Sequence, residues 1–538
     1  MTAPDLAAAA TVIEHADQVV AAATRHLASA GSVDSDQVLA YDIAHAAAAV
    51  ATAKGLLDYG AKGDIEGRIT CAFVADAVAD LAAKVFGQEA TWGVQPGALD
   101  ATRDFLGTYR AAEFLVGIDE PGPRHLDSDF EMVQDTFRRF ADAELAPIAE
   151  HIHRENGDIP EKIISGLAEM GAFGLSIPTE YGGYGEGGEG EYIAMVVATE
   201  ELSRGSLGAG GSLITRPEIL ARALLAGGTE DQKHEWLPKL AIAEVMNAVA
   251  VTEPDYGSDV AGVKVTASAT DGGWLINGVK TWCTFGARAD VLLLLARTDP
   301  DRSKGHRGLS MFIVPKERGD GHGFELEQST AEGGSGGGKM EGRPIDTIGY
   351  RGMHSYEIAF EDWFVPASNL IGLEDGEGRG FYYQMAGFEN GRLQTAARAI
   401  GVMQAAYEKA KAYAEDRVVF GSPIAQYQLT QAKLGRMAVV IQASRQFSYV
   451  VARLMAKGEG TAEASMVKAY VCKAAEWVTR EAMQIHGGMG YAEEYDVSRY
   501  FVDARVLSIF EGADETLCLK VIARKLVADA AATAETAA

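Results

Sequence analysis

The spacing of apolar residues changes twice along this chain, and the order of the changes constrains the fold more than any other feature. Apolar residues recur at helical spacing up to about Val245, alternate with a period of two from Ala248 to about Leu373, and then return to helical spacing. Glycine-containing segments inside the alternating stretch, at 271–273 and at Asn277-Gly278, are typical of hairpin turns. The pattern therefore predicts a β domain between two helical regions.

Breaks in these patterns divide the 538 residues into four expected domains. The segment Gly117–Pro123 contains two glycines and two prolines and is expected to be a linker. We expect an additional N-terminal helical module at 1–116, a helical domain at 117–245, a middle β domain at 246–375 and a C-terminal helical domain at 376–538. In the last domain, helices are expected at 381–416, 427–455, 461–485 and 515–534. The N-terminal module carries no candidate catalytic cluster, and we expect it to pack on the rest of the chain.

Two segments of the helical regions share an order of features. Leu39–Gly87 and Leu434–Gly487 each contain a helix, a turn with Lys and Gly, and an Ala-rich helix that ends at a glycine. An internal duplication would produce this likeness, and so would a shared Ala-rich helical composition. The sequence leaves both explanations open.

The charge balance argues against several classes of partner. Lys and Arg total 48 against 76 Asp and Glu, so the formal net charge is −28. A surface of this sign repels a phosphate backbone, so no nucleic acid partner is expected, and an anionic substrate would require local arginines or lysines. The apolar run Leu292–Ala296 is far shorter than a membrane span and is followed by charged residues, so no membrane association is expected.

The cysteines and the first residues indicate a compartment. The four cysteines are widely spaced and lack metal-ligand spacing, which is typical of a reducing environment, and no metal site is expected. The segment Met1–Leu6 lacks the basic region of a signal peptide. We therefore expect a cytoplasmic protein.

Three short motifs suggest sites that the surrounding residues disfavour. Gly183–Gly188 satisfies the dinucleotide-binding pattern G-x-G-x-x-G, but it follows Pro178 instead of a buried strand. Gly333–Lys339 is similar to a P-loop, yet Met340 stands where a Ser or Thr would hold magnesium, so a flexible loop of the β domain is expected. His151-Ile-His153 places two imidazoles on different sides of a helix, so we expect a solvated helix face instead of a metal site.

Six composite motifs occur in a fixed order between residues 125 and 530. They are Val251-Thr-Glu-Pro-Asp-Tyr-Gly-Ser258-Asp, Asn277-Gly-Val-Lys-Thr-Trp-Cys-Thr284, Arg351-Gly followed by Phe360-Glu-Asp and Val365–Gly372, Arg417-Val-Val-Phe420-Gly-Ser-Pro-Ile, Gln484-Ile-His-Gly-Gly-Met-Gly-Tyr491, and Ile509-Phe-Glu511-Gly512. With these motifs the chain resembles an acyl-CoA dehydrogenase. The resemblance implies an α-helical N domain, a β-barrel middle domain and a C-terminal four-helix bundle, to which the N-terminal helical module is an addition.

The resemblance also implies a reaction and a catalytic base. Members of this family remove a proton from the carbon α to a thioester and transfer a hydride from the β carbon to FAD. Glu511 occupies the family's base position, and the absent side chain of Gly512 lets the substrate approach. In some relatives the base comes from the position before the Arg392 equivalent, which is Gly391 here, so Glu511 is the expected base. The apolar pair Ile509-Phe510 favours burial of this carboxylate.

By the same resemblance, two groups of residues hold FAD. The isoalloxazine is expected against Val249, Val251, Thr252, Gly257, Ser258, Trp282 and Thr284, with core packing as the alternative role of Trp282. The adenosine diphosphate part is expected against Arg417, Phe420, Gln428, Gln484, Gly487 and Gly488, typically across a subunit boundary. Ala513 and Glu515 stand where the family usually has Thr and often has Gln, so this flavin contact departs from the pattern.

The expected substrate contacts are fewer. Ser258 and Glu389–Arg392 correspond to coenzyme A contacts, with a helix-surface salt bridge as the alternative role of Arg392. Tyr256 replaces a small residue of the family motif and is expected either to narrow the acyl channel or to lie in a solvent-exposed turn. Arg216, just before Pro217, is the candidate cation for a distal carboxylate.

The additional N-terminal module and the Gly-rich insertion resemble the branch of the family that acts on a short, branched dicarboxylic acyl-CoA. This implies oxidation of methylsuccinyl-CoA to mesaconyl-CoA, with electrons passed to an electron-transfer flavoprotein, by a homodimer or homotetramer. The alternatives are an acyl-CoA oxidase, a dehydrogenase of another short-chain acyl-CoA and, more remotely, a nucleic-acid-binding flavoprotein of this family.

Overall fold

The computed structural model describes residues 2–319, 322–329 and 337–537. The chain forms two compact units, one made of Met1–Thr136 with Arg392–Ala538 and the other of Phe137–Gly391. Two helices, α6 (Ser128–Phe140) and α13 (Gly380–Asp416), continue along the chain from one unit into the other. The helices expected in the N-terminal and C-terminal parts of the sequence thus belong to the same unit.

The first unit is almost entirely helical. Before α6 it contains α1 (Leu6–Ser29), α2 (Gln37–Gly60), α3 (Asp64–Val85), α4 (Arg103–Tyr109) and α5 (Ala112–Leu115). After α13 it contains the short strands β9 (Val418–Val419) and β10 (Ser422–Pro423), then α14 (Gln428–Ala456), α15 (Thr461–His486), α16 (Asp496–Leu507), α17 (Asp514–Thr516) and α18 (Ala523–Ala537). The side chains of Asp5 and Asp36 cap α1 and α2 by accepting from backbone N–H groups, which stabilises both helix starts.

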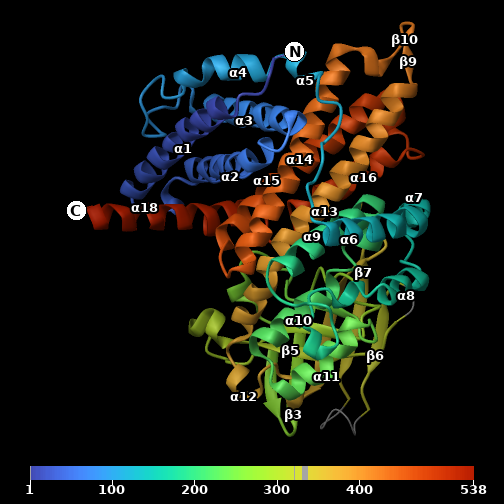
Figure 1. The fold of residues 1–538 in the computed structure, drawn as a ribbon. Helices are drawn as coiled ribbons and strands as arrows, with labels where there is room; N and C mark the ends of the chain where they lie inside the picture. The colour runs from blue at the N-terminus through green and yellow to red at the C-terminus, as the bar shows by residue number, and fades with distance from the viewer. Residues whose placement is uncertain (1, 320–321, 330–336, 538) are drawn as a thin grey trace. The chain divides into compact units, whose positions relative to one another are not determined.

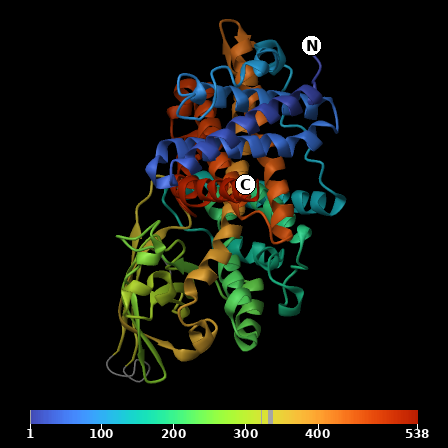
Figure 2. The same ribbon diagram turned by 90° about the vertical axis from the view of Figure 1, so that its left-hand side faces the viewer.

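The N-terminal module packs on the C-terminal helices of this unit, as expected from the sequence. Helix α2 lies against α14 and α15, and α1 lies against α18 (Figure 1; Figure 2, where the blue helices lie in front of the orange and red ones). A Cβ atom at Gly435 would lie 2.5 Å from the Leu115 carbonyl oxygen, so α14 and α5 approach as closely as a glycine allows. Arg436 of α14 also pairs with Asp76 of α3 at 3.0 Å.

The two segments of similar sequence are both helical hairpins. Leu39–Gly87 spans α2 and α3, Leu434–Gly487 spans most of α14 and all of α15, and the two hairpins contact one another. Both the duplication and the shared composition predict paired helices, so the fold agrees with each of them.

The second unit combines helices with one mixed sheet. Its helices are α7 (Ala146–Arg154), α8 (Glu161–Glu169), α9 (Glu189–Gly205), α10 (Arg216–Gly227), α11 (Glu230–Ala241) and α12 (Leu373–Gly376). Its strands are β1 (Asn247–Ala250), β2 (Thr266–Thr270), β3 (Gly273–Lys280), β4 (Val291–Arg297), β5 (Leu309–Pro315), β6 (Phe324–Glu327), β7 (Lys339–Ile345) and β8 (Ser355–Pro366). The order is β1-β4-β2-β3-β8-β7-β6 with β5 also on β4, and β1 and β2 run parallel to β4.

Helices α10 and α11 share an apolar core with the central strands. Leu224, Leu237, Leu293 and Ile313 are all buried in it. Strand β4 is buried along its whole length because it is covered on both faces, which explains its unbroken apolar run. The described part of the chain contains no helix that is both long enough and apolar enough to cross a membrane.

Several sequence predictions need correction. Asn277-Gly278 is not a hairpin turn: it lies inside β3, where the register with β8 shifts and Gly278 has a φ of 127°. The turn at 271–273, in contrast, does connect β2 and β3. The expected helix at 515–534 contains a π-helical segment, Leu517–Ile522, before α18. Helix α16 was not among the expected helices.

The structure describes two of the three short motifs in full and one only in part. Gly183–Gly188 is a loop in which Gly185 makes an isolated bridge with Pro178, and no buried strand precedes it. Of the P-loop-like segment, residues 333–336 lie outside the described residues, and Lys339 begins β7. His153 is buried and its carbonyl accepts from Arg351 at 2.7 Å, so the expectation of a solvated helix face was wrong for this residue. The side of α7 that carries His153 faces the interior of the second unit.

Candidate active site

The expected base lies on a short loop of the first unit between α16 and α17. We call residues 508–514 the base loop. The backbone N–H of Asp514 donates to the Ser508 carbonyl at 3.1 Å and closes this loop. Glu511 and Gly512 both have positive φ values, 54° and 98°, so the loop turns sharply at the expected base. A glutamate in this region is strained and is held there only when its surroundings fix it.

The Glu511 side chain is 10% exposed and lies next to a buried cation. Its Oε1 atom is 3.8 Å from Nη2 of Arg398, a residue of α13 whose side chain is almost completely buried. The Arg398 guanidinium also donates to the Thr395 hydroxyl at 3.1 Å and lies 5.0 Å from the centre of the Phe510 ring. Ile509 is exposed, so burial of the carboxylate comes from these other neighbours.

A second buried cation holds the base loop from α15. Lys468 donates from Nζ to the Gly512 carbonyl oxygen at 2.6 Å. Burial lowers the pKa of Lys468 against the opposing charges of Glu511 and Asp514. Arg398 and Lys468 were missed by the sequence reasoning. No clear signal marked them in the sequence, because α13 and α15 each contain several other charged residues.

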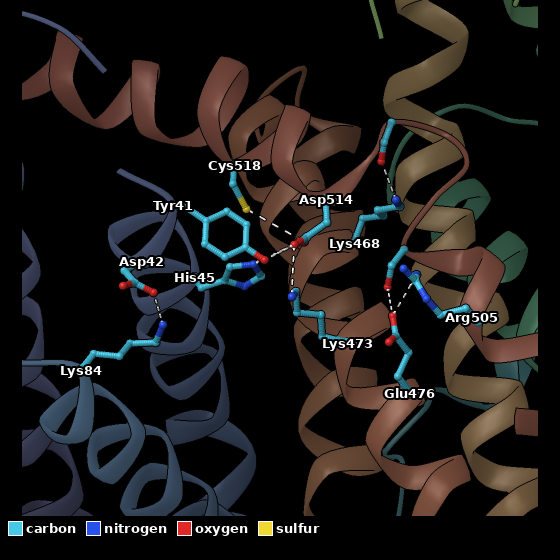
Figure 3. Close-up of polar contacts among 12 residues, drawn as sticks. Tyr41, Asp42, His45, Lys84, Lys468, Lys473, Glu476, Arg505, Asp514 and Cys518 are labelled. Atoms are coloured by element: carbon cyan, nitrogen blue, oxygen red, sulfur yellow. Dashed lines mark hydrogen bonds and ion pairs between the residues drawn. The ribbon is translucent and has the colours of Figure 1, made fainter. Parts of the chain in front are cut away.

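The last residue of the base loop makes long-range contacts. The Asp514 carboxylate accepts a hydrogen bond from the Tyr41 hydroxyl at 2.5 Å and lies 3.1 Å from Nε2 of His45, both on α2. Lys473 of α15 lies 3.4 Å from the same oxygen. Figure 3 shows these three side chains directed at the carboxylate, with the thiol of Cys518 next to the Tyr41 ring. None of these contacts was expected from the sequence.

The residues expected around the isoalloxazine gather in the second unit. The segment after β1 and the segment after β3 lie side by side, because the Thr281 N–H donates to the Thr252 carbonyl at 2.8 Å. Buried Lys280 ties them together by donating to the Val251 carbonyl at 2.9 Å and to Glu253 at 2.8 Å. Of the predicted residues here, Val251 is buried, Val249, Thr252 and Thr284 are half-buried, and Gly257 and Ser258 are exposed.

Trp282 lies on this surface in an unusual conformation. Its φ is 58°, and its side chain is 55% exposed, so the alternative of core packing was wrong. The neighbouring Cys283 N–H donates to the Tyr356 carbonyl, and the Thr284 hydroxyl lies 3.0 Å from the Ser355 hydroxyl. These bonds anchor the residues after Trp282 to β8, and on the preceding side the Thr281 N–H is bonded to the Thr252 carbonyl. The indole is therefore directed outward by a fixed backbone and is available to a planar ligand.

The residues expected around the adenosine diphosphate lie at the surface of the first unit. Phe420, at the β9–β10 turn, is 96% exposed and has a φ of 53°. The ring of Tyr413, near the end of α13, stacks on His486 at 4.2 Å and so brings the start of this turn next to the end of α15. The other predicted residues of this group, Arg417, Gln428, Gln484, Gly487 and Gly488, are all exposed.

The expected substrate residues differ in how deeply they are buried. Arg392 is buried and donates to the Ser465 hydroxyl at 3.2 Å, so the alternative of a helix-surface salt bridge was wrong. Arg216 is also buried, at the start of α10, and donates from Nε to the Ser212 carbonyl at 3.3 Å. Tyr256 is half-buried beneath Lys264 and Glu389 is half-buried on α13, whereas Ser258 is exposed.

The two departures from the family motif lie at the end of the base loop and just after it. Ala513 is half-buried and precedes α17, and Glu515 is exposed on α17.

Comparisons with known proteins agree with this arrangement. The family profiles for the N-terminal, middle and C-terminal domains of acyl-CoA dehydrogenases match residues 127–244, 248–363 and 378–527. The (2S)-methylsuccinyl-CoA dehydrogenase of Cereibacter sphaeroides is 44% identical over 407 residues, which cover 76% of this chain and 71% of that protein.

Solved structures show the same likeness. A glutaryl-CoA dehydrogenase in complex with glutaryl-CoA matches with a TM-score of 0.67 and 30% identity, over 75% of this chain and 96% of that one. A glutaryl-CoA dehydrogenase from Mycobacterium smegmatis in complex with FADH2 matches with a TM-score of 0.64 and 26% identity, over 75% and 96% of the two chains. The chain belongs to the acyl-CoA dehydrogenase family, which acts on the CH–CH group of acyl-CoA with FAD. The resemblance and the fold class expected from the motifs are therefore confirmed.

Proposed function

We propose that this protein oxidises methylsuccinyl-CoA to mesaconyl-CoA with FAD as its cofactor. The observation that carries the proposal is the 44% identity to (2S)-methylsuccinyl-CoA dehydrogenase over three quarters of the chain. The base loop, with a mostly buried carboxylate beside a buried arginine, supports the chemistry that the proposal requires.

The residues of the second unit fit a flavin. Trp282 offers an exposed indole beside the Thr252 and Thr284 hydroxyls, so one surface supplies both a stacking partner and hydrogen-bonding groups. In the proposal, Arg417 supplies positive charge to the pyrophosphate and Phe420 packs beside the adenosine. When bound, FAD supplies the acceptor for the hydride that leaves the β carbon of the substrate.

In this proposal Glu511 removes the proton from the α carbon. A carboxylate is a weak base toward such a carbon, so its position and the exclusion of water decide the rate. The positive φ values at Glu511 and Gly512 and the bond from Lys468 fix the direction of the side chain. Gly512 has a φ of 98°, a backbone conformation that L side chains rarely adopt, so the loop in this form favours a glycine.

The distal carboxylate of the substrate requires a cation, which we assign to Arg216. The other arginine of the same helix, Arg222, is engaged with Glu191 and Glu218. Burial raises the pKa of Glu218, and Glu218 also accepts from Asn390 at 3.2 Å. This arrangement supports Arg222 as a structural residue.

The proposal extends to the acceptor and the assembly. We propose an electron-transfer flavoprotein as the electron acceptor and a homodimer or homotetramer as the working form. In the proposal, the exposed Phe420 ring is covered by an adenosine and a partner subunit.

A screen of CoA thioesters with an artificial electron acceptor tests the proposal. Methylsuccinyl-CoA is expected to give the highest kcat/KM, above glutaryl-CoA, butyryl-CoA and isobutyryl-CoA. A higher value for a neutral acyl group would contradict the dicarboxylic assignment. Oxygen uptake without any other acceptor would indicate an acyl-CoA oxidase instead.

A further inference from the structure

The base loop is held at several points by residues outside it. Two of these anchors are side chains of α15 (Figure 3). Glu476 accepts a hydrogen bond from the Ser508 hydroxyl at 2.5 Å, and Lys468 donates to the Gly512 carbonyl. The third anchor is Asp514, whose carboxylate is shared between α15 and α2. Glu511 therefore lies between anchors on both sides, within three residues of each.

The contacts from α2 are strong ones. The Tyr41 hydroxyl donates to the Asp514 carboxylate at 2.5 Å, and the His45 ring nitrogen lies 3.1 Å away. The Asp514 side chain is only 7% exposed and the His45 side chain 14%, so water competes little for these bonds. Burial and the neighbouring Asp514 raise the pKa of Tyr41 to about 12, so the phenol remains a donor at working pH.

A metal ion is not needed to explain this cluster. Cys518 completes a group of three metal-ligating side chains with His45 and Asp514. However, burial raises the pKa of the Cys518 thiol, which disfavours the thiolate that a metal would bind. The Lys473 ammonium, 3.4 Å from the Asp514 carboxylate, already supplies a positive charge. The hydrogen bonds thus account for the arrangement.

We infer that Tyr41 and His45 are positioning residues, through which the additional N-terminal module holds Glu511 in its catalytic orientation. The inference rests on the proposed function, because it takes Glu511 as the base. It assigns a role in the reaction to a module that lies outside the region matched by the family profiles. Neither residue is expected to touch the substrate or the flavin.

Two neighbouring residues of α2 provide a matched test in the full-length, FAD-loaded protein. Tyr41→Phe removes only the hydroxyl that reaches Asp514. The control, Asp42→Asn, breaks the ion pair with Lys84 inside the module and touches nothing in the base loop. A double variant, Tyr41→Phe with His45→Asn, removes both contacts from α2.

Hydrogen–deuterium exchange is the first measurement, because it needs no substrate. Losing a hydrogen bond to a buried charge is expected to make amides of residues 508–517 exchange about ten- to hundredfold faster in Tyr41→Phe, with a larger effect in the double variant. The control is expected to match the wild type there. Unchanged exchange in both variants would overturn the inference.

Stopped-flow bleaching of the flavin by methylsuccinyl-CoA is the second measurement. Displacement of the base is expected to slow bleaching about tenfold or more in Tyr41→Phe while the substrate concentration at half-maximal rate changes little. Faster exchange with an unaltered bleaching rate would overturn the positioning role. If no short acyl-CoA bleached the wild-type flavin, the proposed function itself would fail, an outcome distinct from a failure confined to the variants.

Discussion

Replacing Glu511 by Gln tests the assignment of the base most directly. The substitution keeps the length and volume of a side chain that is 10% exposed, so the base loop should keep its shape. It removes the anion that accepts the proton. A positioned general base usually contributes about 10²–10⁴-fold, so flavin bleaching by methylsuccinyl-CoA should slow by at least about 10²-fold.

The structure also indicates how much folding free energy the Glu511→Gln variant should lose. The attraction between Glu511 and Arg398 at 3.8 Å is about 4 kcal/mol at an effective dielectric constant of 20, and desolvation offsets most of it. Because Arg398 keeps its bond to Thr395, we expect the variant to lose only about 1–2 kcal/mol and to retain its FAD.

The assay compares Glu511→Gln with Glu494→Gln, which makes the same charge change at an exposed position of the same unit. Stopped-flow absorbance follows the flavin, and the bound FAD is measured after gel filtration. Near-normal bleaching in Glu511→Gln would refute the reasoning, and Glu389 would then be the next carboxylate to test. Loss of bound FAD would assign Glu511 a structural role instead.

Four further predictions concern other parts of the molecule. Arg216→Ala should lower kcat/KM for methylsuccinyl-CoA by about 10²-fold and that for butyryl-CoA much less, whereas equal losses would make Arg216 structural. Trp282→Phe should reduce the quenching of tryptophan fluorescence when FAD is added to apoprotein, and unchanged quenching would place the flavin elsewhere. Deleting residues 1–117 should cause aggregation or loss of activity, because the faces of α14 and α15 that α2 covers become exposed; a fully active, soluble truncation would contradict this. The bonds from His45 and Tyr41 and the charge of Lys473 outweigh burial and lower the pKa of Asp514 from 3.8 to about 2. Its stabilising effect is therefore present above about pH 4 and lost as the pH falls toward 2, so the difference in urea midpoint between wild type and Asp514→Asn should shrink as the pH falls below 4.

Periodicity predicted the long elements well. The helices expected at 381–416, 427–455 and 461–485 agree with α13, α14 and α15 to within one residue at each end. Long amphipathic or Ala-rich helices make most of their contacts at short sequence separation, so a local pattern is enough to find them. The β domain was found from its pattern as well, although β4 is an unbroken apolar run and does not alternate.

Local patterns failed where a distant part of the chain decides the outcome. Asn277-Gly278 has the composition of a two-residue turn, yet Asn277 instead exchanges hydrogen bonds with Asp362, 85 residues away. His153 became buried because the segment around Arg351 covers it. In both cases the deciding partner lies far outside any window in which a pattern is read.

The candidate site likewise contains residues that a local motif predicts and residues that meet only in the folded chain. Glu511 and Gly512 were found because a short motif contains them, but whether they act as expected depends on groups that no motif contains. Tyr41 and Asp514 are separated by 473 residues and meet only in the folded unit. The buried cations Arg398 and Lys468 lie in helices with several other charged residues, and nothing in the sequence shows which of these cations are buried or which carbonyl or carboxylate they face.

The electrostatics of the base loop hold the N-terminal module and the C-terminal helices of the first unit together more tightly than the burial of apolar area alone would. A buried carboxylate such as Asp514 is stable as an anion only while donors and cations surround it. Two of its three partners with short contacts, Tyr41 and His45, belong to α2, and the third, Lys473, belongs to α15. If α2 were removed, water would reach Asp514 and compete for Lys473, and the third anchor of the base loop would weaken. The base loop, which carries Glu511, would then be held less firmly even if the remaining helices kept their fold. A variant that keeps every apolar contact of α2 but lacks the Tyr41 hydroxyl separates the two effects, because only the electrostatic one should change.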